Sequence, residues 1–401
     1  MVLIIGRFTI NECQKMSENP DQIEIQVVVS LKDFLKLEEI WKLVLKDSNV
    51  DLIFLTFEWF SSFIRSFNLQ DRLFIILIYS GTDPVGILPF YRDRDKLFGL
   101  HANVLRSITN VHTPKYNFIV KTGYEDFVER ALNLSREKFS WDFVQIDYVV
   151  EDSFLVKTFC AKQQKSVSVK RVEKLKSPHL AIDCDWPEYW NKRIPKSLRN
   201  DVKRLERQAG EKYGVQFEPV SGDLLEPEDL KEAFTIEDSG WKGRDGSSIL
   251  KNPEFEAFYH ELAFCMNRKG WFELFFLSFG GKRVAFEYCL KYNSFICPLK
   301  IGYEDNYKRY GLGNMLRRMI LEKSFANRYE KYDLLGSIDS YKLKWTNRID
   351  VLYSLYIFNR KVKSRMLNFL LFGASELADK MGIKNYLKKG NSKIKGLLGE
   401  T

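Results

Sequence analysis

One order of predicted elements occurs twice in this chain, and such a repeat restricts the fold more than any single motif. The first copy comprises helices at 31–45 and 57–68, strands at 73–79, 84–91 and 116–120, a helix at 124–139 and a strand at 141–147. The second comprises helices at 195–209 and 228–238, strands at 272–279, 283–290 and 295–302, a helix at 311–327 and a strand at 332–335. The repeat predicts two related α/β (α+β) domains, each with a mixed, mostly antiparallel sheet flanked by helices. The alternative is a chance likeness between two unrelated mixed domains.

The length of 401 residues and a hydrophobic content of 45% also fit two separate cores. The boundary is expected near 165–190, because lysine, serine and proline crowd together between Lys165 and Pro178. We therefore predict an N-terminal domain at 1–175, a C-terminal domain at 176–358 and a basic helical tail at 359–401.

The net charge of +9 is concentrated in that tail. From Arg360 to Thr401 there are ten Lys/Arg and three acidic residues, so the tail carries +7 and the other residues +2. This distribution argues against a DNA-binding core. The tail also has apolar residues at 362, 366, 369, 370, 373, 377 and 381. Such a helix either binds an anionic membrane surface or packs against the folded domains.

The six cysteines form no CxxC pair, and four histidines give no metal-ligand spacing, so no metal site is predicted. The start of the chain lacks a basic segment before a short apolar run, and no window approaches the ~20 apolar residues of a transmembrane helix. These features predict a cytoplasmic protein, with peripheral binding to the inner face of the membrane as an option.

A polar loop that leads into two glycines and a helix is the sharpest local signal. Lys308 and Arg309 precede Gly311 and Gly313, and an amphipathic helix follows. Glycines allow close approach of a ligand to the backbone, and the free amides of a helix N-terminus suit a pyrophosphate. A tight turn without a ligand would produce the same pattern.

Several stretches resemble GNAT enzymes, and in particular the CelD-like acetyltransferases of exopolysaccharide and cellulose gene clusters, which are relatives of the Fem transferases. The resembling segments are Ser197–Glu206, Glu237–Gly246, Leu299–Tyr303, Asp333–Trp345, Thr56–Trp59 and Pro84–Phe90. The resemblance covers about residues 50–360 and implies tandem GNAT-like domains. It departs at Tyr310, where relatives usually carry proline.

The resemblance implies acetyl-CoA or another acyl-CoA as co-substrate. Its pyrophosphate would lie on the loop, and the backbone at 301–303 would hold the oxyanion. The implied cofactor-binding residues are Ile301, Tyr303, Lys308, Arg309, Tyr310, Gly311, Leu312, Gly313 and Asn314. The N-terminal domain has only Lys121–Tyr124 at the matching place, which is too short to wrap a pyrophosphate.

The candidate catalytic residues are Glu237 and Tyr341. Glu237 would act as a general base or bind the substrate amine, although a carboxylate at a helix end is often only solvated. Tyr341 would protonate the leaving thiolate, or would merely pack beside Trp345.

Substrate binding is assigned to Trp241, Lys242, Lys300 and Lys342. Lys300 lies in an apolar strand, so it should pair with a carboxylate such as Glu287 or face a ligand. Trp241 would line the cleft or fill the core. The helix at 195–209 has a cationic face (Lys196, Arg199, Lys203 and Arg207) that is either solvated or a docking strip for an anionic substrate.

Together these features predict an acyltransferase that moves an acyl group from acyl-CoA to an amine or hydroxyl of a sugar or cell-envelope intermediate, free or lipid-linked. One alternative is a Fem-like aminoacyl transferase, for which tRNA would be the partner. Another is a catalytically degenerate GNAT scaffold in polysaccharide assembly.

Overall fold

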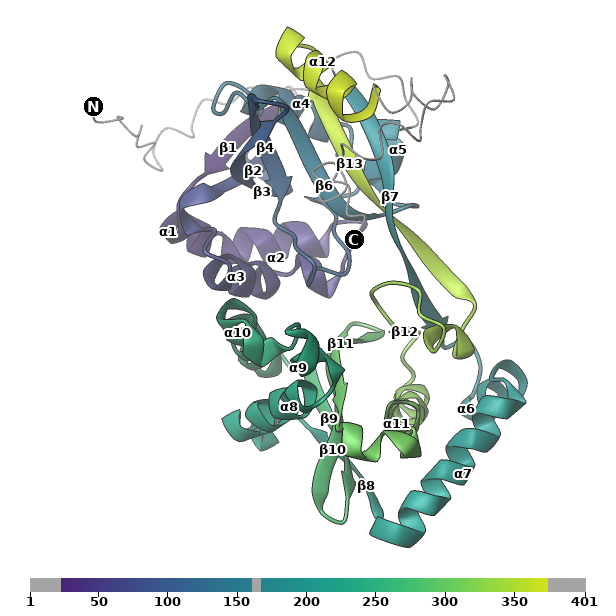
Figure 1. The fold of residues 1–401 in the computed structure, drawn as a ribbon. Coiled ribbons are helices and arrows are strands. Elements are labelled where there is room, and N and C mark those ends of the chain that lie inside the picture. The colour runs from purple at the N-terminus through teal and green to yellow at the C-terminus, as the bar shows by residue number, and fades with distance from the viewer. Residues whose placement is uncertain (1–22, 161–166, 374–401) are drawn as a thin grey trace.

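A computed structural model describes residues 23–160 and 167–373. Within these residues one mixed sheet of 13 strands runs through the molecule in the order β1-β2-β3-β4-β6-β13-β7-β12-β11-β10-β9-β8, with β5 beside β3 (Figure 1). The strands are β1 (Ile23–Val28), β2 (Leu73–Ser80), β3 (Asp83–Leu97), β4 (Leu100–Ser107), β5 (Ile119–Val120), β6 (Phe143–Val150), β7 (Val167–Ala181), β8 (Val215–Val220), β9 (Phe272–Phe279), β10 (Lys282–Tyr292), β11 (Phe295–Tyr303), β12 (Lys331–Asp333) and β13 (Arg348–Asn359). The predicted mixed α/β class is confirmed.

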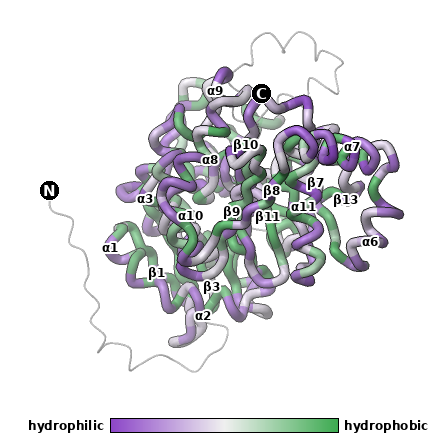
Figure 2. Tube along the Cα trace, turned by 90° about the horizontal axis from the view of Figure 1, so that it is seen from below, coloured by the Kyte–Doolittle hydropathy of each residue, from purple (hydrophilic) through white to green (hydrophobic). Residues whose placement is uncertain are grey.

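Helices cover both faces of this sheet in each half. They are α1 (Leu31–Phe34), α2 (Glu38–Lys46), α3 (Phe57–Ser66), α4 (Phe127–Ser135), α5 (Phe154–Cys160), α6 (Trp186–Glu188), α7 (Lys196–Tyr213), α8 (Pro227–Ser239), α9 (Trp241–Asp245), α10 (Pro253–Arg268), α11 (Leu312–Ala326) and α12 (Val362–Asn368). Seen from below, α7 lies at the margin of the molecule with long hydrophilic stretches (Figure 2). Its Leu198, Val202 and Ala209 are buried, so the cationic residues of this helix face outward as expected.

The sheet repeats itself outward from its centre. In the first half β1, β2, β3, β4 and β6 occupy the places that β8 to β12 occupy in the second. Neighbouring strands in both halves are antiparallel, except for the innermost pairs β4–β6 and β11–β12, which are parallel. The repeated order of strands predicted from the sequence is therefore present.

The strand equivalent to β11 is β4 rather than the predicted strand at 116–120. β4 pairs with Phe90–Leu97 of β3, whereas β5 pairs only with Gly86 and Ile87 of that strand. The outer part of β3 contains the charged run Arg92–Lys96, so this part of the strand has no hydrophobic pattern in the sequence. Residues 108–118 form a loop between β4 and β5, and this loop reaches the C-terminal half.

The centre of the sheet is a long antiparallel pair that joins the two halves. β13 pairs with β7 from Arg348, opposite His179, to Asn359, opposite Val167. β13 also pairs with β6 of the first half, and β7 with β12 of the second. The predicted boundary between residues 175 and 176 lies inside β7. The stretch rich in Lys and Ser that suggested a linker is therefore a strand whose side chains are mostly exposed or half-buried.

The two halves also share one apolar core. Helix α3 of the first half packs on α10 of the second, with the ring of Phe258 5.5 Å from Trp59 and 5.8 Å from Phe63. One buried cluster contains side chains from both helices and from the strands of both halves. Sequence analysis missed α10, although Asn252 caps its N-terminus and Pro253 occupies its first turn, which are standard start signals.

A buried ion cluster ties the 108–118 loop to the centre of the sheet. Lys115, 4% exposed, forms an ion pair with Asp333 at the end of β12 and lies 2.6 Å from Asp350 of β13. Burial opposes charge on all three groups, yet the carboxylates raise the pKa of Lys115 and Lys115 lowers the pKa of Asp333. The pKa of Asp350 is lowered by a hydrogen bond from His179 and by Lys115. This cluster fixes the position of the loop relative to the second half.

Helix α12 packs on the N-terminal half after β13. Its Leu367 is buried, together with Leu371 and Phe372, against Tyr356 and Phe358. The residues of the predicted apolar stripe are not the ones buried in this contact. Residues 362, 366 and 369 are exposed, 370 and 373 are half-buried, and 377 and 381 lie outside the described residues. Among the described helices, none is long and apolar enough to cross a membrane.

Candidate active site

Strands β11 and β12 part soon after they begin. They pair only at Phe295–Ile296 and Lys331–Tyr332, after which β11 continues to Tyr303 along β10 alone. Opposite Tyr288 and Cys289, β11 carries the extra residue Leu299, a β-bulge that bends a strand away from its neighbour. The free edge at 299–303 is where the sequence placed Ile301 and Tyr303.

The predicted glycine loop follows this free edge. Residues 305–310 form a 3₁₀ turn, and Gly311 then adopts φ +63°, a left-handed conformation that favours glycine, at the N-terminus of α11. Among the described residues, the amides of Leu312 and Gly313 have no hydrogen-bond acceptor. A Cβ on Gly313 would meet nothing within 4 Å, so a ligand can approach this backbone. The loop can therefore receive an anion.

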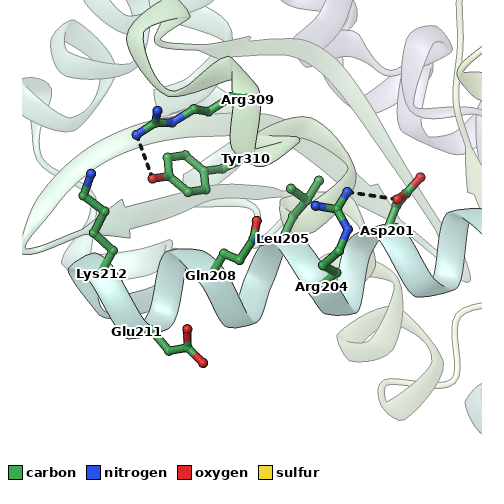
Figure 3. Close-up of a pocket in the computed structure, with 8 residues that line it drawn as sticks. All are labelled: Asp201, Arg204, Leu205, Gln208, Glu211, Lys212, Arg309 and Tyr310. Atoms are coloured by element: carbon green, nitrogen blue, oxygen red, sulfur yellow. Dashed lines mark hydrogen bonds and ion pairs between the residues drawn. The ribbon is translucent and has the colours of Figure 1, made fainter.

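A pocket of about 670 Å³ opens beside the loop, between Arg309–Tyr310 and helix α7. In Figure 3 the side chains of Gln208 and Lys212 point from α7 toward the loop, whereas Arg204 donates to Asp201 of its own helix at 3.1 Å. Arg309 donates a hydrogen bond of 3.0 Å to the Tyr310 hydroxyl. Lys308 and Arg309 are exposed while Tyr310 and Leu312 are buried. Asn314 faces the second core, where its Oδ1 accepts a 3.3 Å bond from Trp345.

Glu237, Lys242 and Lys300 come together at the free edge of β11. The buried Glu237 accepts from Lys242 Nζ at 2.7 Å with one carboxylate oxygen and from the Ile249 amide at 2.9 Å with the other. Lys242 Nζ also donates to the Ile301 carbonyl at 2.9 Å. Glu237 is therefore not merely solvated: it links α8, α9 and β11.

Lys300 does not pair with Glu287. Lys300 lies opposite Tyr288 in the ladder, so strand alternation puts the Glu287 side chain on the other face of the sheet. The Lys300 ammonium instead lies 5.0 Å from the centre of the Tyr259 ring. Burial, only partly offset by Glu237, lowers the pKa of Lys300 to about 8.

Glu287 belongs to a second buried network below the opposite face. It accepts from Arg317 of α11 at 3.0 Å and from the Tyr332 hydroxyl at 2.6 Å. The Arg317 guanidinium also lies 5.4 Å from the centre of the Tyr341 ring. Burial raises the pKa of Tyr341, so this phenol is protonated at neutral pH. The network was not predicted, because only the pleat and α11 bring its members together.

The other two predicted substrate-binding residues form no hydrogen bond with this cluster in the described part of the chain. Trp241, 53% exposed at the start of α9, does not fill the core. The buried Lys342 donates to the Leu335 and Ser337 carbonyls at 2.8 and 3.0 Å, so it holds the loop after β12.

His112 enters this region from the N-terminal half, and sequence analysis did not single it out. Its Nδ1 lies 2.9 Å from the Tyr259 hydroxyl, and its ring packs on Phe255. Its buried Nε2 has no hydrogen-bond partner among the described residues. Burial, with added repulsion from Lys300 and Lys242, lowers the pKa of His112 to about 3.

The pKa of His112 predicts a loss of stability in mild acid. An unfolded histidine titrates near pH 6.5, so below that pH the unfolded chain binds a proton that the folded chain refuses until about pH 3. At pH 5 this difference amounts to ~2 kcal/mol of unfolding free energy. Urea unfolding of the wild type and of His112→Gln at about pH 7.5 and 5 tests it. The variant should lose ~2 kcal/mol less than the wild type on acidification; equal losses would show that His112 is not the cause.

No group of three or more His, Cys, Asp or Glu residues in the described part of the chain could hold a metal ion.

Comparisons with known proteins agree with this geometry. Residues 196–343 match the family described as acetyltransferase (GNAT) domain. FemX has a similar structure, with a TM-score of 0.56 and 11% identity, over 86% of this chain and 99% of FemX. L-PGS from Bacillus licheniformis gives a TM-score of 0.51 at 13% identity, over 83% of this chain and 95% of that protein. No match was found among curated protein sequences.

A third similar structure is the C-terminal domain of a putative lysylphosphatidylglycerol synthetase from Agrobacterium fabrum. It has a TM-score of 0.52 and 10% identity, over 84% of this chain and 95% of that domain. At these identities the likeness concerns the fold, and it extends over both halves. Residues 196–343 thus match the acetyltransferase (GNAT) domain model, and they lie within a two-part fold similar to that of FemX.

Proposed function

We propose that this protein transfers an acyl group from acyl-CoA to an amine or hydroxyl of a sugar or cell-envelope intermediate, as in the CelD-like branch of the GNAT enzymes. One observation carries the proposal: the free edge of β11 lies between a helix start with free backbone amides and a buried cluster of ionisable side chains. Both features lie inside the segment that matches the acetyltransferase domain.

The loop supports acyl-CoA as the donor. The amides of Leu312 and Gly313, with Lys308 and Arg309 beside them, would hold the pyrophosphate. The pocket between Arg309 and α7 would accommodate the nucleotide end. The backbone at 301–303 would bind the thioester carbonyl, because a free strand edge offers amides to a developing oxyanion.

The cluster divides the remaining roles. During transfer the acceptor nitrogen or oxygen bonds to the acyl carbon, the C–S bond breaks and the acceptor loses a proton. Both oxygens of Glu237 already accept hydrogen bonds. Its contacts therefore favour a role as a positioning residue, which holds Lys242 and through it the Ile301 carbonyl. Lys300 forms no hydrogen bond or ion pair through its side chain among the described residues, and it would receive the proton as a neutral amine. Tyr341 would supply a proton to the leaving thiolate.

Substitution of Lys300 tests this division. Lys300→Arg keeps the positive charge but cannot act as a base near neutral pH, so kcat/KM should fall by ~10²–10⁴-fold. With a pKa of about 8, the wild-type rate should rise with pH and level off above that value, and the variant should lose this limb. The measurement is CoA thiol release with amino-sugar acceptors from about pH 6 to about pH 9.

The matched control is Lys291→Arg on the neighbouring strand, where the lysine lies 3.5 Å from Glu273 and outside the cluster. This variant should retain the wild-type rate and pH profile. CoA binding, followed by calorimetry, should be unchanged in both. A Lys300→Arg enzyme with a wild-type rate and profile would exclude Lys300 as the base.

A second candidate is Fem-like aminoacyl transfer from aminoacyl-tRNA, and the likeness to FemX over both halves favours it. The same loop would then face the end of a tRNA, and the cationic side of α7 could bind the phosphates. A chain that binds a charged tRNA but neither CoA nor acetyl-CoA would support this candidate over the first. A chain that binds neither would point to a degenerate scaffold.

The acceptor class also implies a location. Sugar and envelope precursors that are lipid-linked lie at the inner face of the cell membrane, so the proposed function places this protein in the cytoplasm beside that surface.

A further inference from the structure

A basic pocket lies far from the proposed active site, at the end of the β7–β13 pair. It has a volume of about 480 Å³ between α12 and the first residues of β7. Its lining includes the cation Arg365, the amides of Asn359 and Asn368 and the ring of Phe369, together with Lys170 and Arg360, which already have partners of their own. Among the described residues that line it, none is acidic. This composition suits a phosphate ester.

An apolar stripe stands beside this pocket. Val362, Met366 and Phe369 are 83%, 41% and 51% exposed, and their spacing of four and three residues puts them on one face of the helix. The opposite face of α12 is held in the core by Leu367. The helix is therefore fixed in place by one face while it presents three apolar side chains outward.

The charged residues beside the apolar stripe also distinguish this face of α12 from an ordinary protein surface. Arg365 has no acidic partner within the described ranges, whereas Lys363 lies 2.7 Å from Asp142 on the side toward β6. Apolar side chains next to cations fit a bilayer interface, where the chains enter the acyl region and the cations meet lipid phosphates. A nucleic acid or another soluble polyanion would leave the apolar stripe unused.

We propose that the α12 face binds an anionic phospholipid bilayer, with a lipid phosphate in the pocket and Val362, Met366 and Phe369 inserted at the interface. In Figure 1, α12 lies at the end of the molecule opposite α7 and α11, so binding there leaves the glycine loop uncovered. The inference does not depend on the proposed acyl transfer, because it uses none of the residues assigned to it.

The test is co-sedimentation of the full-length protein with vesicles of phosphatidylcholine alone or mixed with phosphatidylglycerol. Only the mixed vesicles should bind strongly. Arg365→Gln should weaken binding about fivefold. Val362→Ser with Phe369→Ser should weaken it by more than about tenfold. Leu224→Ser, at a site 73% exposed, and Arg207→Gln on α7 are matched controls that should bind like the wild type.

Because all these side chains are exposed, thermal unfolding should be unchanged, and a loss of binding can be assigned to the surface. Equal binding to neutral and anionic vesicles would overturn the proposal. So would α12 variants that bind like the wild type while Lys388→Gln with Lys389→Gln abolishes binding, since the later residues would then carry it. Inorganic phosphate, added at constant ionic strength, should not displace the protein from vesicles, because it cannot replace the apolar contacts.

Discussion

Gly311→Val should reduce the affinity for CoA about 100-fold and leave the chain folded. Gly311 has φ +63°, which a β-branched residue adopts only with strain, and a Cβ there would lie 3.0 Å from Leu205 of α7. The loop must shift, and the amides of Leu312 and Gly313 then lose their alignment. Charge-assisted hydrogen bonds are worth ~1.5–3 kcal/mol each, so misaligning even one or two accounts for the loss.

Calorimetry with CoA and acetyl-CoA measures this effect directly. Gly81→Val is the matched control, because Gly81 has φ +60° with nothing within 4 Å of a Cβ and lies in the β2–β3 turn of the other half. The control carries similar backbone strain but should bind CoA normally. If Gly311→Val binds CoA as well as the wild type, the loop is not the pyrophosphate site.

Lys115→Met should destabilise the protein by ~3–5 kcal/mol. The substitution leaves two carboxylates, Asp333 and Asp350, close together in the interior without their main counter-charge. Breaking a buried ion pair from one side typically costs this much, because the remaining charge keeps its desolvation penalty. Lys331 lies 3.2 Å from Asp350 and should limit the loss.

Urea unfolding of both proteins near neutral pH checks this value. Lys121→Met is the control, since Lys121 pairs at 3.0 Å with the exposed Asp83 and a surface pair contributes at most ~1 kcal/mol. The carboxylates predict a further difference. Their pKa values are lowered in the fold, so the stabilisation holds above about pH 4 and is lost in stronger acid. Equal stabilities of Lys115→Met and wild type would mean that the cluster contributes nothing net.

The sequence predicted those parts of the fold that have a local signal. The hairpin of β9 and β10, strand β11 and the start of α11 were found because apolar alternation and glycine turns mark them. Strand β13 and the strand role of residues 167–178 were missed, because β7 and β13 recognise each other across about 180 residues of sequence. A strand that is stabilised mainly by a distant partner need not have a hydrophobic pattern of its own.

The candidate site divides in the same way. The glycine loop, Glu237, Lys242 and Lys300 were proposed from motifs, and the last three do lie together at the edge of β11. Whether a group acts as a base or as a positioning residue depends on its hydrogen-bond partners. The spacing of residues in the sequence does not reveal those partners. His112 could not have been included, since only the packing of α3 on α10 brings the first half against Tyr259.

The exchange of strands at the centre of the sheet has a consequence for how this protein is made. The sheet of the first half needs β13, which the ribosome delivers only after the whole second half. During translation the edge of β6 therefore has no partner strand, and an unpaired strand edge can pair with other chains. Residues 1–175 produced alone should be prone to association, and a nascent chain should depend on chaperones until residue 359 has left the exit tunnel.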